Sequence, residues 1–248
     1  MAPTDIKAYN SRKHNYKKAS TDRCTRIISS IIGSHAFPGT ITIHSVTEAR
    51  LDDSSRLQDI ADPTTALIYW IDGSYKCAGV NDVLGAGVAW QDEQKWHYAS
   101  YSLGANTGNA QDAELFGISL ALGLAVERVV VEGEAIELVR VFSDAQQVLD
   151  ALANDNPNML GPAGMKCWAL RDVYEWADTL EKAGVKVELV WVKGHSQSMG
   201  NRVADEAAVK ATKMQKESLG KGKRFLVRRE DAPDDMKDAD RDAVEEWL

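Results

Sequence analysis

The chain has 248 residues, of which 44% are hydrophobic and 27% charged, and its formal net charge at pH 7 is −8. This composition is typical of a soluble globular protein, and the acidic balance argues against a protein that coats nucleic acids. No run of 18 apolar residues occurs, so we expect no transmembrane helix, and Cys24, Cys77 and Cys167 lack disulfide or metal-site spacing. We therefore expect an intracellular protein, nuclear or cytoplasmic, that is not secreted.

The chain divides into three predicted regions. Residues 1–63 are a polar, basic N-terminal extension that we expect to be partly disordered, because residues 1–30 carry seven basic and two acidic side chains. Residues 64–215 contain regular apolar periodicity and form the predicted catalytic domain. Residues 216–248 are a charged, acidic tail with few large apolar side chains.

Within residues 64–215 the apolar patterns predict strands and helices in a defined order. Three strands come first, over residues 66–71, 85–90 and 96–101, and a helix over 110–126 follows. The remaining elements are a strand, two helices, a strand and a helix, over residues 136–142, 144–153, 165–183, 186–192 and 201–213. The order βββαβααβα predicts an α/β fold with a mixed five-stranded sheet flanked by helices.

Four acidic residues lie where these predicted elements would bring them together. Asp72 and Asp144 end two strands that can be neighbours, Glu114 lies early in the first helix, and Asp205 lies one turn after Asn201 on the last helix. Clustered carboxylates repel one another and raise each other's pKa values. Two Mg²⁺ or Mn²⁺ ions would resolve this repulsion and hold a scissile phosphodiester, so all four acids are candidate metal ligands.

Each of these residues also has an ordinary structural interpretation. Asp72 could belong to a turn with Gly73, Asp144 could cap a helix, and Glu114 could favour a helix dipole. Asp205 could be an exposed helix position, and His195 could be a loop residue without a task. Only the combination of all five favours a catalytic site.

Five sequence blocks in one order resemble type 1 ribonuclease H. They are Ile71-Asp72-Gly73-Ser74, Asp112-Ala113-Glu114-Leu115, Phe142-Ser143-Asp144-Ala145-Gln146, Trp191 to His195, and Gly200-Asn201 with Ala204-Asp205. The variants in the second and third blocks look most like the ribonuclease H domains of fungal non-LTR retrotransposons. The resemblance covers roughly residues 64 to 215.

This resemblance implies a ribonuclease H-like fold and a function. The expected activity is hydrolysis of the RNA strand of RNA/DNA hybrids with two Mg²⁺ or Mn²⁺ ions, leaving 5′-phosphate and 3′-hydroxyl ends. Asp72 and Asp144 would be shared metal ligands, and Glu114 would contact a metal and the RNA 2′-hydroxyl. Asp205 would be the remaining ligand, and His195 a proton shuttle that helps the product leave.

The resemblance is weaker at the expected substrate contacts. Gly73 and Ser74 could meet the RNA strand through their backbone amides, and Asn109 and Gln111 could hold a DNA-strand phosphate or simply begin a helix. Asn201 is a further expected contact. The chain lacks the basic protrusion of bacterial members and has Ala110 where asparagine is common. The alternative function is a catalytically silent scaffold, a retroelement remnant that binds nucleic acid or a protein partner of unknown identity.

Overall fold

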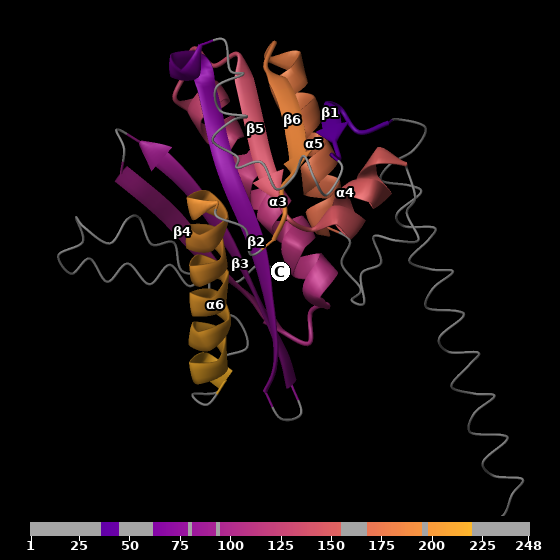
Figure 1. Ribbon diagram of the computed structural model, residues 1–248, viewed down its shortest axis with the longest axis vertical. Coiled ribbons are helices and arrows are strands. Elements are labelled where there is room, and N and C mark those ends of the chain that lie inside the picture. The colour runs from indigo at the N-terminus through magenta and orange to yellow at the C-terminus, as the bar shows by residue number, and fades with distance from the viewer. Residues whose placement is uncertain are drawn as a thin grey trace, which may run out of the picture.

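The computed structural model describes residues 36–44, 62–78, 81–92, 95–154, 168–194 and 198–219 (Figure 1). Most of the N-terminal extension lies outside the described residues, as do His195 and all but residues 216–219 of the acidic tail. The predictions that the N-terminal extension is partly disordered and that the C-terminal segment is a tail stay predictions.

A single mixed sheet forms the centre of the described structure. Its strands lie in the order β1-β6-β5-β2-β3-β4. They are β1 (Thr40–Thr42), β2 (Ala66–Ala78), β3 (Asn81–Asp92), β4 (Lys95–Ala105), β5 (Leu138–Ser143) and β6 (Lys186–Trp191). β2, β3 and β4 pair as an antiparallel meander, whereas β1, β6, β5 and β2 run parallel. The predicted α/β class with a mixed sheet is confirmed.

The predicted count of five strands is corrected to six among the described residues. The additional strand, β1, lies in the stretch assigned to the N-terminal extension and pairs Ile41 with Leu189 of β6. Ile41 also packs against the main hydrophobic core. Three residues are too few to carry a periodic signal, so this strand depends on the β6 edge for its hydrogen bonds and on the core for its burial.

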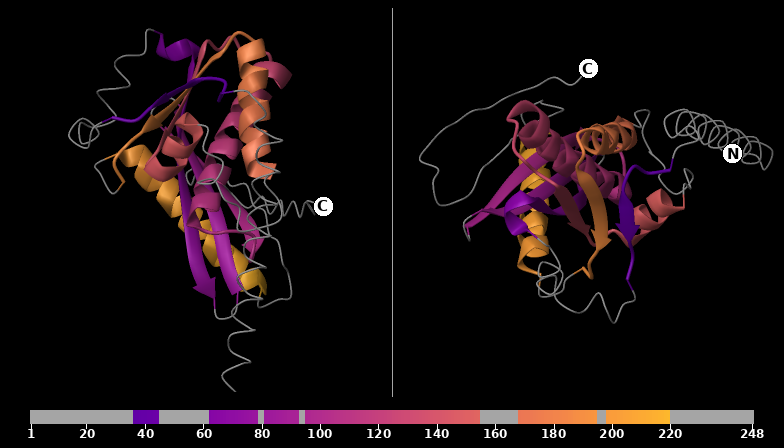
Figure 2. Two further views of the ribbon diagram at one scale, coloured as in Figure 1. Left: turned by 90° about the vertical axis from the view of Figure 1, so that its right-hand side faces the viewer. Right: turned by 90° about the horizontal axis from the view of Figure 1, so that it is seen from above.

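Helices cover both faces of the sheet (Figure 2). They are α3 (Ala110–Val126), α4 (Gln146–Ala153), α5 (Trp168–Lys182) and α6 (Met199–Leu219), with the short segments η2 (Pro63–Thr65) and η3 (Glu127–Val131). α3, α4 and α5 contribute to the larger core on one face, and α6 packs over the opposite face. No described helix combines the length and apolarity needed to span a lipid bilayer.

Small side chains let α6 approach the sheet closely. A Cβ atom on Gly85 would lie 2.7 Å from the Ala208 carbonyl oxygen, and one on Gly87 would overlap the Ala204 carbonyl oxygen. Two serines of β4 bind the same helix, because Ser100 Oγ donates to the Ala207 carbonyl at 2.9 Å and Ser102 Oγ to that of Ala211 at 2.8 Å. This packing fixes α6, and hence Asp205, against β3 and β4.

We expect Gly87→Ala to lower the free energy of unfolding by about 1–3 kcal/mol, because the added methyl group has no space beneath α6. Gly123→Ala is the matched control, since a Cβ there would lie 3.5 Å from Trp176 Nε1 and a helix interior favours alanine over glycine by up to ~1 kcal/mol. Urea denaturation followed by circular dichroism measures both. Equal stability of Gly87→Ala and the wild type would contradict the close packing of α6.

Candidate metal centre

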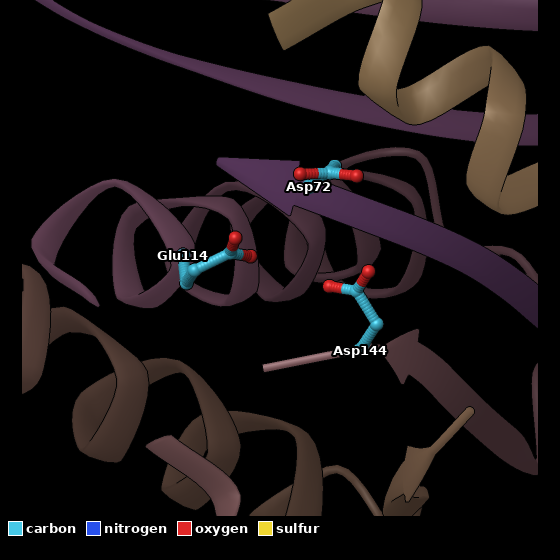
Figure 3. A group of neighbouring side chains, drawn as sticks. All are labelled: Asp72, Glu114 and Asp144. Atoms are coloured by element: carbon cyan, nitrogen blue, oxygen red, sulfur yellow. The ribbon is translucent and has the colours of Figure 1, made fainter. Parts of the chain in front are cut away.

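Three carboxylates from separate elements point toward one another (Figure 3). Asp72 belongs to β2, Glu114 to α3, and Asp144 follows the last residue of β5. One carboxylate oxygen from each lies within 4.8 Å of those of the other two. The last residues paired between parallel strands β2 and β5 are Ile71 and Ser143, so each aspartate is the next residue along its chain. This shared register brings the two aspartates together.

Asp72 does not end its strand, contrary to the sequence prediction. β2 continues to Ala78, and Asp72 is paired with Gly87 of β3. Only the parallel partner β5 ends at this level, because the antiparallel partner β3 continues beside β2. Asp72 therefore lies inside a strand rather than in a turn. At its position β3 still pairs with β2, whereas β5 has just ended.

Glu114 reaches the aspartates because Gly73 has no side chain. A Cβ atom on Gly73 would lie 2.6 Å from the Glu114 backbone nitrogen and 2.8 Å from the Ala113 carbonyl carbon. The first turn of α3 is closed by a capping box between Asn109 and Asp112, so Asp112 is the acid at the helix N-terminus. Glu114 lies beyond that turn and faces β2, and its buried Oε2 atom has no hydrogen-bond partner in the described part of the chain.

Asp144 does not cap the helix that follows it. The N-cap residue of α4 is Ala145, whose side chain makes no capping hydrogen bond. The ordinary interpretation of Asp144 as a capping residue is therefore wrong, and its carboxylate points toward Asp72 and Glu114 instead (Figure 3).

Burial and mutual repulsion make this cluster hold protons tightly. Burial, followed by the charges of Asp144 and Asp205, raises the pKa of Asp72 to about 8. Burial, followed by the charges of Asp72 and Asp144, holds the pKa of Glu114 well above its usual range. A hydrogen bond from the backbone amide of Gly73 lowers both pKa values but does not offset these effects.

The donor set fits a hard divalent cation. Mg²⁺ and Mn²⁺ prefer carboxylate oxygens, and these three carboxylates are held close together in a sheltered position. No hydrogen-bond donor among the described residues contacts the buried Oε2 atom of Glu114, and a bound cation would satisfy this oxygen instead. The three acids would be its protein ligands.

The fourth predicted ligand, Asp205, lies near this group without joining it. It is partly buried on α6, and its charge contributes to the raised pKa of Asp72 and, as the smallest cause, to that of Glu114. His195 lies outside the described residues. The preceding residue, Gly194, packs against the site, because a Cβ atom there would overlap Oδ2 of Asp144.

Residues 64–213 match the family model described as RNase H. The chain belongs to the RNase H family. Among solved structures it is similar to RNase H1 from the halophilic archaeon Halobacterium salinarum NRC-1, at 16% identity over 60% of this chain and 98% of that one, with a TM-score of 0.41. No curated protein sequence matches the chain.

Two further solved structures are similar at comparable levels. The N-terminal RNase H domain of rv2228c from Mycobacterium tuberculosis is 18% identical over 62% of this chain and 99% of that one, with a TM-score of 0.42. LC11-RNase H1, solved in complex with an RNA/DNA hybrid, is 17% identical over 62% of this chain and 99% of that one, with a TM-score of 0.44. At these levels, the assignment to the RNase H family rests on the match to the family model.

In this RNase H family chain, four of the predicted substrate contacts make hydrogen bonds within the protein, although the buried Oδ1 atom of Asn201 has no partner among the described residues. Ser74 Oγ lies 3.3 Å from Thr212 Oγ1 of α6, and Asn109 accepts hydrogen bonds from the backbone of the first turn of α3. Gln111 donates to Gln147 at the start of α4. Asn201 is buried, and its backbone amide donates to Ser198 Oγ at 3.2 Å. Together with Gly73, they remain predicted substrate contacts.

One supporting contact was not predicted. Trp70 stacks on Phe142 with ring centroids 5.4 Å apart, and these residues lie two positions before Asp72 and Asp144. Gly200, in the first turn of α6, lies against the Trp70 ring, which a Cβ atom there would overlap. The sequence contains a signal for this contact, because an aromatic residue stands two positions before each aspartate. It indicates a common support beneath both acids.

In metal-free buffer, we expect the free energy of unfolding to fall as the pH rises from about 4 to about 8. The folded protein keeps the Asp72 proton over this range, whereas the unfolded chain loses it near 3.8, so folding becomes less favourable as the pH rises. Asp72→Asn should remove much of this decline, on the order of a few kcal/mol. Urea denaturation at a series of pH values measures it.

The control for this experiment is Asp178→Asn, since Asp178 is an exposed acid paired with Lys182 on α5. In this variant the free energy of unfolding should fall with rising pH as steeply as in the wild type. Identical slopes for Asp72→Asn and the wild type would contradict the raised pKa of Asp72.

Proposed function

We propose that this protein is an endonuclease that hydrolyses the RNA strand of RNA/DNA hybrids. The convergence of Asp72, Glu114 and Asp144 in a chain of the RNase H family carries this proposal. Each acid lies in one of the sequence blocks that resemble ribonuclease H, and each comes from a different part of the fold. An accidental surface cluster would have neither property.

The proposed reaction is hydrolysis of a phosphodiester. A water oxygen forms a bond to phosphorus, the bond from phosphorus to the 3′ oxygen breaks, and a proton ends on that oxygen. The products are a 5′-phosphate and a 3′-hydroxyl. Two Mg²⁺ or Mn²⁺ ions bound at the carboxylates would supply charge stabilisation at the scissile phosphate and an activated water.

The residues of the chain have separate tasks in this proposal. Asp72, Glu114 and Asp144 would hold the cations, and Asp205 would be the remaining ligand. Glu114 would also contact the RNA 2′-hydroxyl, the group that distinguishes RNA from DNA. His195 follows Gly194, which packs against Asp144, and an imidazole with a near-neutral pKa suits proton transfer at the site.

The motif variants also support a proposal about origin. Asp112-Ala113-Glu114-Leu115 and Phe142-Ser143-Asp144-Ala145-Gln146 are the basis for inferring descent from a fungal non-LTR retrotransposon. An intracellular place of action accords with this substrate and this origin. A catalytically silent scaffold is the competing function, and the presence of all three converging acids disfavours it.

We expect the purified chain to cut the RNA strand of a labelled hybrid with Mg²⁺ or Mn²⁺, and to cut neither matched double-stranded RNA nor matched DNA. EDTA should abolish cutting. Asp144→Asn should lower the rate roughly 100-fold or more, because a metal ligand supports several kcal/mol of transition-state stabilisation. Gel analysis of the products measures the rates and identifies the ends.

Asp178→Asn is the matched control and should cut at the wild-type rate, because Asp178 pairs with Lys182 on the exposed side of α5. A folded wild-type chain that binds Mn²⁺ but cuts no substrate would favour the silent scaffold. Equal cutting by Asp144→Asn and the wild type would exclude this site as the active site.

A further inference from the structure

The backbone at Asp144 turns sharply between β5 and α4. Ala145 has φ −76° and ψ 66°, and the Gln146 amide donates to the Asp144 carbonyl at 2.8 Å. These values define an inverse γ-turn centred on Ala145. The ladder between β5 and β6 ends with Ser143 and Trp191, so Asp144 lies beyond the regular pairing of the sheet.

A side chain from the neighbouring strand holds this turn. The indole N–H of Trp191 donates to the same Asp144 carbonyl at 3.2 Å. Trp191 is the last residue of β6, is 6% exposed and belongs to the main core, so its ring is fixed by packing. The next residue, Val192, donates its backbone amide to the Ser143 carbonyl at 2.9 Å. The end of β6 therefore binds the β5–α4 turn through both side chain and backbone.

Gly194 leaves space for the carboxylate of the same aspartate, because it has no side chain. A Cβ atom on Gly194 would overlap Oδ2 of Asp144 and would lie 3.1 Å from its Cγ atom. The segment from Trp191 to Gly194 thus contacts Asp144 at its carbonyl and at its carboxylate. When Asp72 and Glu114 lose their protons, their charges repel this carboxylate. The bond from Trp191 then restrains the turn that carries it.

We propose that Trp191 and Gly194 are positioning residues that hold the Asp144 carboxylate toward Asp72 and Glu114. This inference rests on the proposed function in one respect, that the three carboxylates bind a divalent cation. Trp191 acts through the backbone of Asp144 and Gly194 through its side chain. Loss of the Trp191 bond would free the turn, and a side chain at position 194 would take the space of the carboxylate, so either change would weaken cation binding.

The first test is Trp191→Phe in the full-length chain, with Mn²⁺ alone as the probe in isothermal titration calorimetry. Phenylalanine keeps an aromatic ring but removes the N–H donor. We expect Mn²⁺ affinity to fall by roughly 2- to 10-fold, the effect of losing one net hydrogen bond. Trp90→Phe is the matched control, because Trp90 packs on the same face of the sheet and its ring contacts Tyr69 and His97.

Stability and kinetics separate positioning from a merely structural role. Both tryptophan variants should lose some thermal stability in EDTA, but only Trp191→Phe should lose Mn²⁺ affinity. In the hybrid cleavage assay, Trp191→Phe should need more Mg²⁺ for half-maximal rate at an unchanged KM for the hybrid. Wild-type Mn²⁺ affinity in folded Trp191→Phe would overturn the role of Trp191.

Gly194→Ala is a second, independent variant if the first does not fold. Its methyl group would displace the Asp144 carboxylate, so Mn²⁺ affinity should fall by about 10-fold or more. Unchanged affinity would overturn the role of Gly194. If the wild type binds Mn²⁺ and the variants bind it less tightly, the inference stands even if no hybrid is cut. If the wild type binds no Mn²⁺, the inference and the proposed metal site both fail.

Discussion

The fold holds the carboxylates of Asp72, Glu114 and Asp144 close together in a sheltered position, although their charges repel one another. Burial and mutual repulsion raise the pKa of Asp72 to about 8 and that of Glu114 well above its usual range. Such a cluster persists only if the surrounding elements cannot relax and separate the acids. The end of parallel pairing between β2 and β5 sets the spacing of Asp72 and Asp144, and Gly73 sets the approach of Glu114.

Apolar packing supplies that rigidity. Trp70 stacks on Phe142 beneath the two aspartates, and the start of α6 lies against Trp70 at Gly200. Side chains close-packed in this way shift little in response to a nearby charge. The repulsion is therefore relieved by binding protons or cations rather than by movement of the backbone. The proposed affinity for a divalent cation would follow from this rigidity, and the proposed phosphodiester hydrolysis would depend on that affinity.

The sequence predicted the features that arise locally. The helix over 110–126 was predicted with the bounds found for α3, because Asn109 can cap it and its apolar face is continuous. The grouping of Asp72, Glu114 and Asp144 followed from the family-like blocks. Features that arise from tertiary pairing were missed. β1 needs the β6 edge, and β2 extends past Asp72 only because β3 pairs with it. The bond from Trp191 to Asp144 joins residues 47 apart in sequence, so no local pattern predicts it.

We expect Asp72, Glu114 and Asp144 to bind one divalent cation together. A crystal structure of the full-length chain grown with Mn²⁺ would test this, with anomalous diffraction recorded at wavelengths on either side of the manganese absorption edge. It should show an anomalous peak coordinated by oxygens of all three carboxylates, with the Trp191 bond to Asp144 intact. Carboxylates that point apart, or the absence of manganese at this position in crystals that hold it elsewhere, would contradict the proposed site.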